Sequence, residues 1–431
     1  MLMSKNNFRP KCLYLLVSLS LLSSCAKYAP AGTCKDTDAL LKSHNITGTV
    51  AQPLSPAESF DQWQNNFRQY ALSKGITEKT LNQAFEGVTP DDTVIAATQK
   101  QPEKITPIWE YIEKRTTAEN ITNGKALMTQ YAEASNNIAR RYQVEPSLLF
   151  AFLSVESAYG RQAGDKQVIR SLVTLDYYNY RRDFYRQNLI AALQMLQQGD
   201  ATRQQMLGSW AGAMGMPQFM PDSYLHYAAD YDGDHHANIW TSYPDTLASV
   251  ANYMHEAGWK KGIPWGVEVN LPDGFDYSLT GLDTKKTIEN WRALGVNSAT
   301  QADLAALSSE NASVLLPAGK DGPAFLVTQN FRAIMRYNSD VSYAMTVGIL
   351  SDSYQHSVTL HKSWPLQQQP LTMNERKALQ VLLQEKHLYQ GDIDGNIGSG
   401  SVRAIRAYQK QQKLPEDGYP GRALFEKLRC S

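Results

Sequence analysis

The chain has 431 residues, and its 42 Lys and Arg residues balance 42 Asp and Glu residues, so the formal net charge is zero. It is 42% hydrophobic and 19% charged. This apolar content is too high for a disordered chain, and the length predicts two or three domains. Because phosphate binding requires clustered basic side chains, the balanced charge argues against nucleic acid as a partner.

The N-terminus predicts export. Basic residues precede the apolar run 13–22, which is too short to span a bilayer as a helix and is typical of a signal peptide. The run leads into LSSC, which resembles a bacterial lipobox whose cysteine, Cys25, carries lipid. The alternative is an ordinary signal peptide cut nearby. Since Ala26 follows and not Asp, the resemblance to other lipoproteins implies the periplasmic face of the outer membrane.

Residues 1–25 are therefore expected to be removed or lipidated, and the polar, proline-containing stretch 26–56 is expected to be a tether. Two further cysteines, Cys34 and Cys430, lie near opposite ends of the mature chain. In an oxidising periplasm they could form a disulfide, and two unpaired thiols are equally compatible with the sequence. There is no CxxC motif or Cys/His cluster to predict a zinc site.

One long block, 57–357, begins with helical periodicity, because Phe60, Trp63 and Phe67 recur near a 3.6-residue spacing. Beyond residue 260, the segments GVEVNLPDGFDYSL and SVLLPAGKDGPAFLV combine short apolar runs with Asp-Gly turns, as strands do. Helical texture returns at 343–354. The predicted fold class is mainly α (α+β), with a small β insertion. A linker is predicted at 358–371.

The segment VEPSLLFAFLSVESAYG, at 144–160, predicts a buried helix with an acidic residue at its end. Pro146 suits a first helical turn, and nearly every following position is apolar up to Glu156. Burial and the negative end of the helix dipole both disfavour a carboxylate there. The pKa of Glu156 should therefore be raised, as a general acid at neutral pH requires. The alternative is a glutamate that reaches solvent at a helix end.

The segment MLGSWAGAMGMPQFMPDSYLHYAADYDGD, at 206–234, is rich in small and aromatic residues. Gly208, Gly212 and Gly215 allow the backbone to approach other backbone or a ligand closely. Together with Ser209, Gln218 and several aromatic rings they predict a sugar-binding cleft. A packing seam of small residues is the alternative.

Five motifs occur in one order along the chain: ESAYG, TLDYYNYRRDFY, GSWAGAMGMPQFMPDSY, SVANYMHEAGW and RYNSDVSYA. Together they resemble the membrane-bound lytic transglycosylase B family over residues 57–357. The resemblance implies a lysozyme-like α domain with helical and small β elaborations. It also implies non-hydrolytic cleavage of the β-1,4 bond from MurNAc to GlcNAc in peptidoglycan, leaving 1,6-anhydromuramyl ends.

The resemblance also implies roles for individual residues. Glu156 would act first as acid and then as base, with no cofactor required. Ser209 and Gln218 would orient the MurNAc and its N-acetyl group, while Tyr253 and Tyr337 would line the cleft near the acid. Its further walls would be Met214 and Phe219. Core packing is the alternative role for the two tyrosines.

The stretch DYDGDHHANIW places Asp230, Asp232 and Asp234 at positions one, three and five of an EF-hand-like loop. Position six is His235 and not the usual Gly, although His tolerates a left-handed backbone better than most residues. The family closes its loop with a later acid, for which Asp245 is the nearest residue. We expect a weak or vestigial structural Ca²⁺ site, with a solvated acidic turn as the alternative.

The tail, 372–429, alternates three helical stretches with the Asp-Gly loops GDIDGNIG and EDGYPG. Each helical stretch carries an apolar stripe. The pattern is similar to the small three-helix peptidoglycan-binding module of cell-wall enzymes. A spacer bundle that does not bind is the alternative.

The sequence thus predicts an outer-membrane lipoprotein whose partners are peptidoglycan glycan strands, with other cell-wall enzymes left open as partners. Two rival functions remain. The first is a non-catalytic peptidoglycan-binding lipoprotein. The second is a hydrolytic muramidase, which needs a second essential carboxylate; Asp165 and Asp176 are the nearest by sequence.

Overall fold

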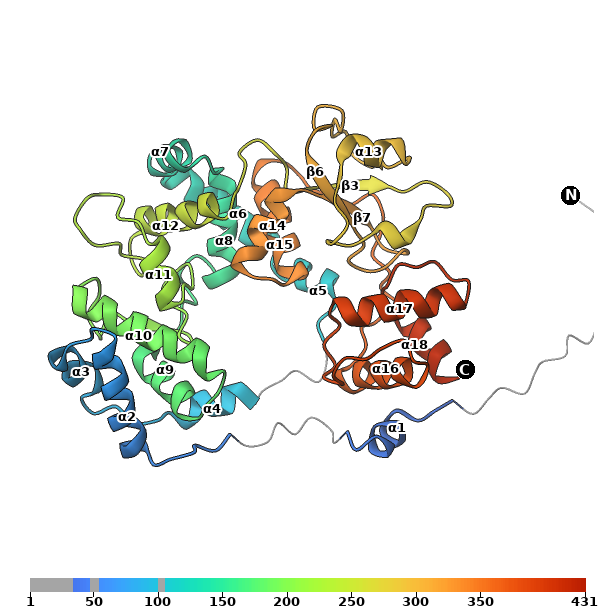
Figure 1. The fold of residues 1–431 in the computed structure, drawn as a ribbon. Coiled ribbons are helices and arrows are strands. Elements are labelled where there is room, and N and C mark those ends of the chain that lie inside the picture. The colour runs from blue at the N-terminus through green and yellow to red at the C-terminus, as the bar shows by residue number, and fades with distance from the viewer. Residues whose placement is uncertain (1–33, 47–53, 100–104) are drawn as a thin grey trace, which may run out of the picture.

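The structure is a computed structural model that describes residues 34–46, 54–99 and 105–431. The predicted signal peptide and Cys25 lie outside these residues. Figure 1 shows a group of N-terminal helices, a central helical body, a small sheet beside that body, and a C-terminal helical module. Within the described ranges, none of the helices combines the length and apolar character needed to cross a bilayer.

The first group of helices packs around a core that contains Trp63, Phe67 and Leu81, all nearly inaccessible to solvent. A capping box starts its first helix, because the Ser59 hydroxyl accepts the N–H of Gln62 and the Gln62 side chain accepts the N–H of Ser59. The members are α2 (Phe60–Ser73), α3 (Glu78–Phe85), α4 (Asp92–Gln99), α9 (Val168–Tyr177) and α10 (Arg182–Gln198).

The central body is built around the predicted buried helix, α8 (Pro146–Ser157). Its residues 148–153 are at most 1% exposed, and it packs against α15 (Val341–Gln355). The remaining helices of the body are α5 (Ile108–Glu113), α6 (Ala118–Gln130), α7 (Ala132–Tyr142), α12 (Tyr243–Glu256) and α14 (Gln329–Tyr337). Helix α11 (Pro221–Tyr227) contacts α10 and α12, and its Tyr224 belongs to the core of the first group. β1 (Lys166–Gln167) pairs antiparallel with β2 (Leu207–Gly208).

The predicted β insertion is a five-stranded sheet of order β4-β6-β7-β3-β5, with antiparallel neighbours. Alternation along β7 divides its side chains between two cores, since Phe325 and Val327 join the helical core while Ala324 and Leu326 join the core around Trp291. The elements are β3 (Gly266–Asn270), η1 (Tyr277–Leu279), β4 (Lys286–Thr287), α13 (Ile288–Ala293), β5 (Asn297–Ser298), β6 (Asn311–Leu315) and β7 (Ala324–Val327). The predicted mainly α class is confirmed.

The C-terminal module consists of α16 (Met373–Glu385), α17 (Ser399–Gln411) and α18 (Arg422–Arg429). A buried glutamine side chain stabilises each of its two Asp-Gly loops through the same pair of hydrogen bonds. Gln380 donates to Asp394 and accepts the N–H of Gly395, and Gln409 does the same with Asp417 and Gly418. Both glutamines are buried, so each loop is held by a satisfied amide inside the module.

The tether prediction for 26–56 differs from the structure in one part. Residues 37–43 form helix α1 (Thr37–Ser43), capped by Asp36, and Leu40 and Leu41 are buried in the core of the C-terminal module. Two adjacent leucines in a polar stretch give no periodic signal, so the helix escaped prediction. Cys34 and Cys430 form a disulfide with an S–S distance of 1.97 Å, which joins the start of this segment to the end of the chain.

Candidate active site

Glu156 lies in the last turn of α8, where the chain leaves the helix through an unusual bend. Three consecutive residues have left-handed backbone conformations, with φ of 49° at Ala158, 60° at Tyr159 and 88° at Gly160. The Ser157 hydroxyl donates to the carbonyl of Met216 at 2.7 Å and ties the bend to the glycine-rich segment. A backbone in a sparsely populated conformation persists only where its surroundings hold it, so the acid has a fixed position.

Glu156 is only partly exposed, and burial raises its pKa from the ordinary value to about 7. Two effects oppose burial: the hydroxyl of Tyr343 donates to Oε1 of Glu156, and the positive charge of Arg115 acts on the carboxylate. Among the described residues, no other carboxylate contributes to this shift in the pKa of Glu156. A pKa near neutrality suits a group that must both give and take a proton.

Tyr343 was missed by sequence reasoning. It is 3% exposed and lies in the first turn of α15, whose N-cap Asp340 accepts the N–H of Tyr343 at 2.9 Å. The available signal was the motif RYNSDVSYA, which contains both Tyr337 and Tyr343. Only Tyr337 was assigned near the acid, although Tyr343 is the residue that contacts it.

The predicted aromatic residues form one cluster. Tyr337 is close enough that the charge of Glu156 contributes to raising its pKa, after burial, and its hydroxyl donates to the carbonyl of Pro217. The ring of Tyr253 lies 4.8 Å from that of Tyr337, and its hydroxyl donates to the carbonyl of Arg336 at 2.7 Å. Both tyrosines are partly exposed, so they combine packing with some accessible surface.

Met214 and Phe219 do not form walls of the cleft, contrary to the prediction. They are 0% and 2% exposed, because the chain pairs Met214 with both Gly208 and Phe219 in short bridges that turn their side chains into the core. Phe219 supports the tyrosines from beneath, with its ring 6.0 Å from Tyr253 and 5.9 Å from Tyr337.

In the glycine-rich segment, 206–215, the backbone passes very close to other backbone, and we call this region the backbone crossing. A Cβ at Gly208 would lie 2.0 Å from the carbonyl oxygen of Ala213, and one at Gly215 would lie 2.6 Å from that of Ile239. These glycines therefore serve backbone packing, which was the alternative reading of the segment.

The crossing also holds the two predicted sugar-binding residues, both partly exposed. The Ser209 hydroxyl accepts the N–H of Ala213 at 3.1 Å. The Gln218 amide donates to the carbonyls of Ala163 and Gly215 at 2.8 Å each, with φ of 52° at Gln218. The Gln218 amide nitrogen is thus engaged within the protein.

The two candidates for a second carboxylate differ. Asp176 is 1% exposed, and its carboxylate accepts Trp63 Nε1 at 2.8 Å and Arg186 Nε and Nη2 at 3.0 and 2.9 Å. A carboxylate engaged in this way is a structural ion pair and is not available for proton transfer. Asp165 is exposed.

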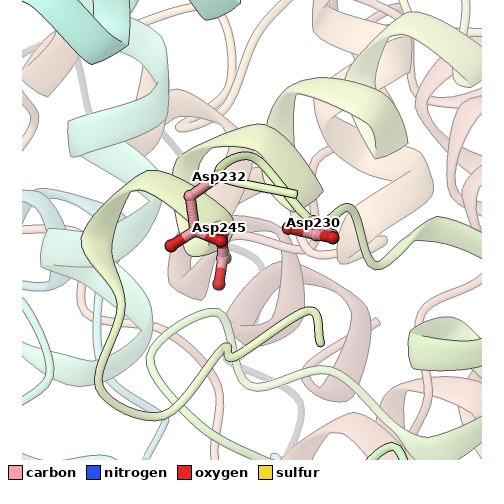
Figure 2. Close-up of side chains that lie close together, drawn as sticks. All are labelled: Asp230, Asp232 and Asp245. Carbon is pink, nitrogen blue, oxygen red and sulfur yellow. The ribbon is translucent and has the colours of Figure 1, made fainter. Parts of the chain in front are cut away.

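The structure brings three of the four predicted metal ligands together. One oxygen each of Asp230, Asp232 and Asp245 lies within 4.8 Å of the others, and Figure 2 shows them between the loop and the start of α12. Asp234 is not part of the group; it is exposed, and its carboxylate accepts the N–H of His236 at 2.8 Å. His235 has φ of 72°, so the left-handed turn survives without glycine.

This donor set fits a hard cation. Ca²⁺ takes carboxylate oxygens at about 2.4 Å, so ligands on opposite sides of one ion lie up to about 4.8 Å apart. Asp245 is 1% exposed, and burial raises its pKa, although it accepts the N–H groups of Tyr231 and Asn238 at 3.0 Å each. A bound cation would favour the charged form of this carboxyl.

Comparison with known proteins assigns the family. The model of the transglycosylase SLT domain matches residues 59–352, and a peptidoglycan binding domain model matches residues 372–428. The chain belongs to the transglycosylase SLT domain family. It is a lytic transglycosylase that acts on peptidoglycan, and its C-terminal module is a peptidoglycan-binding domain.

Individual proteins similar to this chain are also lytic transglycosylases. The chain is 30% identical over 363 residues to the membrane-bound lytic murein transglycosylase B of Escherichia coli K12, covering 79% of this chain and 96% of that protein. SltB3 from Pseudomonas aeruginosa, solved with NAG-anhNAM-pentapeptide, is 45% identical with a TM-score of 0.84, covering 86% of this chain and 100% of that one. Escherichia coli Slt35, solved with calcium, is 30% identical with a TM-score of 0.59, covering 72% and 98%.

The hydrogen bond from Tyr343 predicts how the pH profile responds to Tyr343→Phe. If Glu156 is the general acid, it must be protonated to begin the reaction, and activity should then fall as the pH rises through about 7. Tyr343 lowers the pKa of Glu156 by donating to its charged form, so its loss raises that pKa further. We expect the alkaline limb of kcat/KM to move to higher pH. A rate reduced equally at every pH, with the limb unmoved, would show that Tyr343 only supports the fold.

Proposed function

We propose that the enzyme cleaves the β-1,4 bond between MurNAc and GlcNAc with formation of 1,6-anhydromuramyl ends, using Glu156 as its single acid and base. Protonated Glu156 donates its proton to the glycosidic oxygen as the bond from that oxygen to C1 breaks. The resulting carboxylate then takes the proton of the C6 hydroxyl while O6 bonds to C1. The carboxyl is restored, and no water is consumed.

The observation that carries this proposal is the placement of Glu156, a partly exposed carboxyl that accepts the hydroxyl of Tyr343 and whose pKa burial raises to about 7. Most glycosidases need two carboxyl groups, one as acid and one as nucleophile or base. Here Asp176 is held by Arg186 and Trp63. An intramolecular hydroxyl nucleophile removes the need for the second group. Ser209 and Gln218, beside the crossing that anchors α8, are proposed to orient the MurNAc.

The test is to digest purified sacculi with a protein that begins at residue 26 and to identify the new glycan ends by mass spectrometry. Anhydro ends are expected. Reducing ends would identify water as the acceptor and support the muramidase. No soluble product, under conditions where binding to sacculi is confirmed, would contradict a catalytic role.

The acidic loop is proposed to bind Ca²⁺ weakly through Asp230, Asp232 and Asp245, as a structural ion and not a reactant. Binding to the folded state alone stabilises it by about 1.4 kcal/mol when Ca²⁺ is present at about ten times its Kd. We expect millimolar Ca²⁺ to raise the Tm relative to a chelator, and Asp230→Asn to abolish the shift. Asp234→Asn is the matched control and should keep it. An equal Tm with and without Ca²⁺ would contradict the site.

Anchoring is proposed to occur through lipid on Cys25, at the periplasmic face of the outer membrane. The lipobox-like sequence supports it, as does the relative whose name describes it as membrane-bound. Fractionation should find the wild-type protein with the outer membrane and Cys25→Ala in the soluble periplasm. A Cys25→Ala protein that stays membrane-bound would contradict the anchor.

A further inference from the structure

The C-terminal module and the catalytic domain together line a half-open cavity of about 180 Å³, and none of the predicted site residues is part of its lining. Trp109 and Ser342 face it from the catalytic side, and Arg376 and Tyr419 from the module. A cavity of about 150 Å³ is enough to hold a molecule the size of benzene. This space is therefore large enough for the end of a peptide but not for a pair of sugar rings.

Polar contacts outside the cavity lining also join the module to the catalytic domain. Arg406 of α17 donates to the carbonyl and hydroxyl oxygens of Thr280 at 2.7 and 3.0 Å. Asp417, in the second Asp-Gly loop, accepts the N–H of Lys320 at 3.0 Å. Because residues of both domains line the cavity, a ligand in it would touch both at once.

Arg376 is the unusual group in the lining. Its Nε is buried without a hydrogen-bond partner; within the described residues no carboxylate lies within ion-pair distance of this guanidinium, and the charge of Asp394 acts on it only from farther away. The neighbouring Glu375 is already bonded to Arg422. An unpaired, partly buried cation is unfavourable unless a ligand compensates for it, and a guanidinium matches a carboxylate in a planar, two-point arrangement.

We infer that this cavity binds the terminal carboxylate of a peptidoglycan stem peptide, with Arg376 as its counter-ion and Trp109 and Tyr419 against the apolar part of the terminal residue. The inference rests on peptidoglycan being the ligand of the chain. The glycan strands carry no charge of their own, so the carboxylates that an arginine can recognise lie on the stem peptides, and a cavity of this size favours the one at the end of the chain. Ser342 directly precedes Tyr343, so the bound end would lie beside the start of the helix that contacts Glu156.

The experiment measures binding of a synthetic stem pentapeptide to the protein 26–431 by isothermal titration calorimetry, with the same peptide as its C-terminal carboxamide. We expect Arg376→Met to weaken binding of the free acid at least tenfold. The carboxamide should bind the wild type as weakly as the acid binds the variant. Arg403, an exposed arginine of α17 that lies outside the cavity lining, provides the matched control, and Arg403→Met should bind as the wild type does.

Several outcomes would overturn the inference. They are equal binding of acid and carboxamide, undiminished binding by Arg376→Met, and equal displacement by acetate, which would identify a general anion site. The carboxamide comparison needs no variant, so it stands even if Arg376→Met misfolds. The anhydro ends produced from sacculi are measured separately, so loss of peptide binding and failure of the proposed chemistry are distinguishable.

Discussion

Glu156→Gln should reduce formation of anhydro ends from sacculi by roughly 10³-fold or more, because in the proposed mechanism this side chain makes both proton transfers and a single general acid–base step contributes about 10²–10⁴-fold. Gln keeps the size of the side chain and its ability to accept from Tyr343, but it cannot give a proton to the glycosidic oxygen. The measurement is the initial rate of anhydro-end release by mass spectrometry. Glu113→Gln, at an exposed position of α5, is the matched control and should retain full activity.

The stability of the same variant separates lost chemistry from lost folding. Glu156 has a pKa of about 7 in the folded protein, whereas an unfolded Glu titrates near 4.3. Between these values the folded chain binds more protons than the unfolded chain, so the free energy of unfolding contributed by this group falls as the pH rises. Gln does not ionise, so the variant should be more stable than the wild type above pH about 7. An inactive variant that is also less stable at every pH would leave misfolding as the cause.

The sequence predicted those structural features of the candidate site that depend on neighbouring residues, although the backbone crossing was only the alternative interpretation of its segment. The apolar run from Leu148, the terminal position of Glu156 and the glycines of 206–215 are contiguous patterns, and the helix, the raised pKa and the backbone crossing follow from them. Local spacing also indicated the acidic loop, because an Asp at every second position of a turn needs no distant partner to be recognised.

Contacts between distant residues could not be predicted in the same way. Tyr343 reaches Glu156 across 187 positions, and Leu40 of α1 packs into a module more than 300 residues away. Asp176 follows the apolar run of α9 and gives no sign that it pairs with Trp63, which lies 113 positions earlier. Such pairs depend on the path of the whole chain, which composition and periodicity do not specify.

The buried Asp176 pair predicts a large loss of stability when its carboxylate is removed. Asp176→Ala leaves the guanidinium of Arg186 without its bidentate acceptor and the indole N–H of Trp63 without a partner. Removing one member of a buried ion pair typically costs about 3–5 kcal/mol. We expect chemical denaturation to show a decrease of that order in the free energy of unfolding. Asp176→Asn should lose less, because its amide oxygen can still accept from Trp63.

Asp176→Asn, together with Asp165→Asn, also tests whether a second carboxylate takes part in the reaction, as a hydrolytic muramidase would require. If Asp176 is structural, Asp176→Asn should release anhydro ends at close to the wild-type rate per folded molecule, at a temperature where the variant is fully folded. Asp165→Asn, at the exposed alternative position, should change neither stability nor product. A folded Asp176→Asn protein without activity, together with reducing ends from the wild type, would make Asp176 the second catalytic carboxylate. Its bidentate bond to Arg186 argues against that result, because the guanidinium already occupies both carboxylate oxygens.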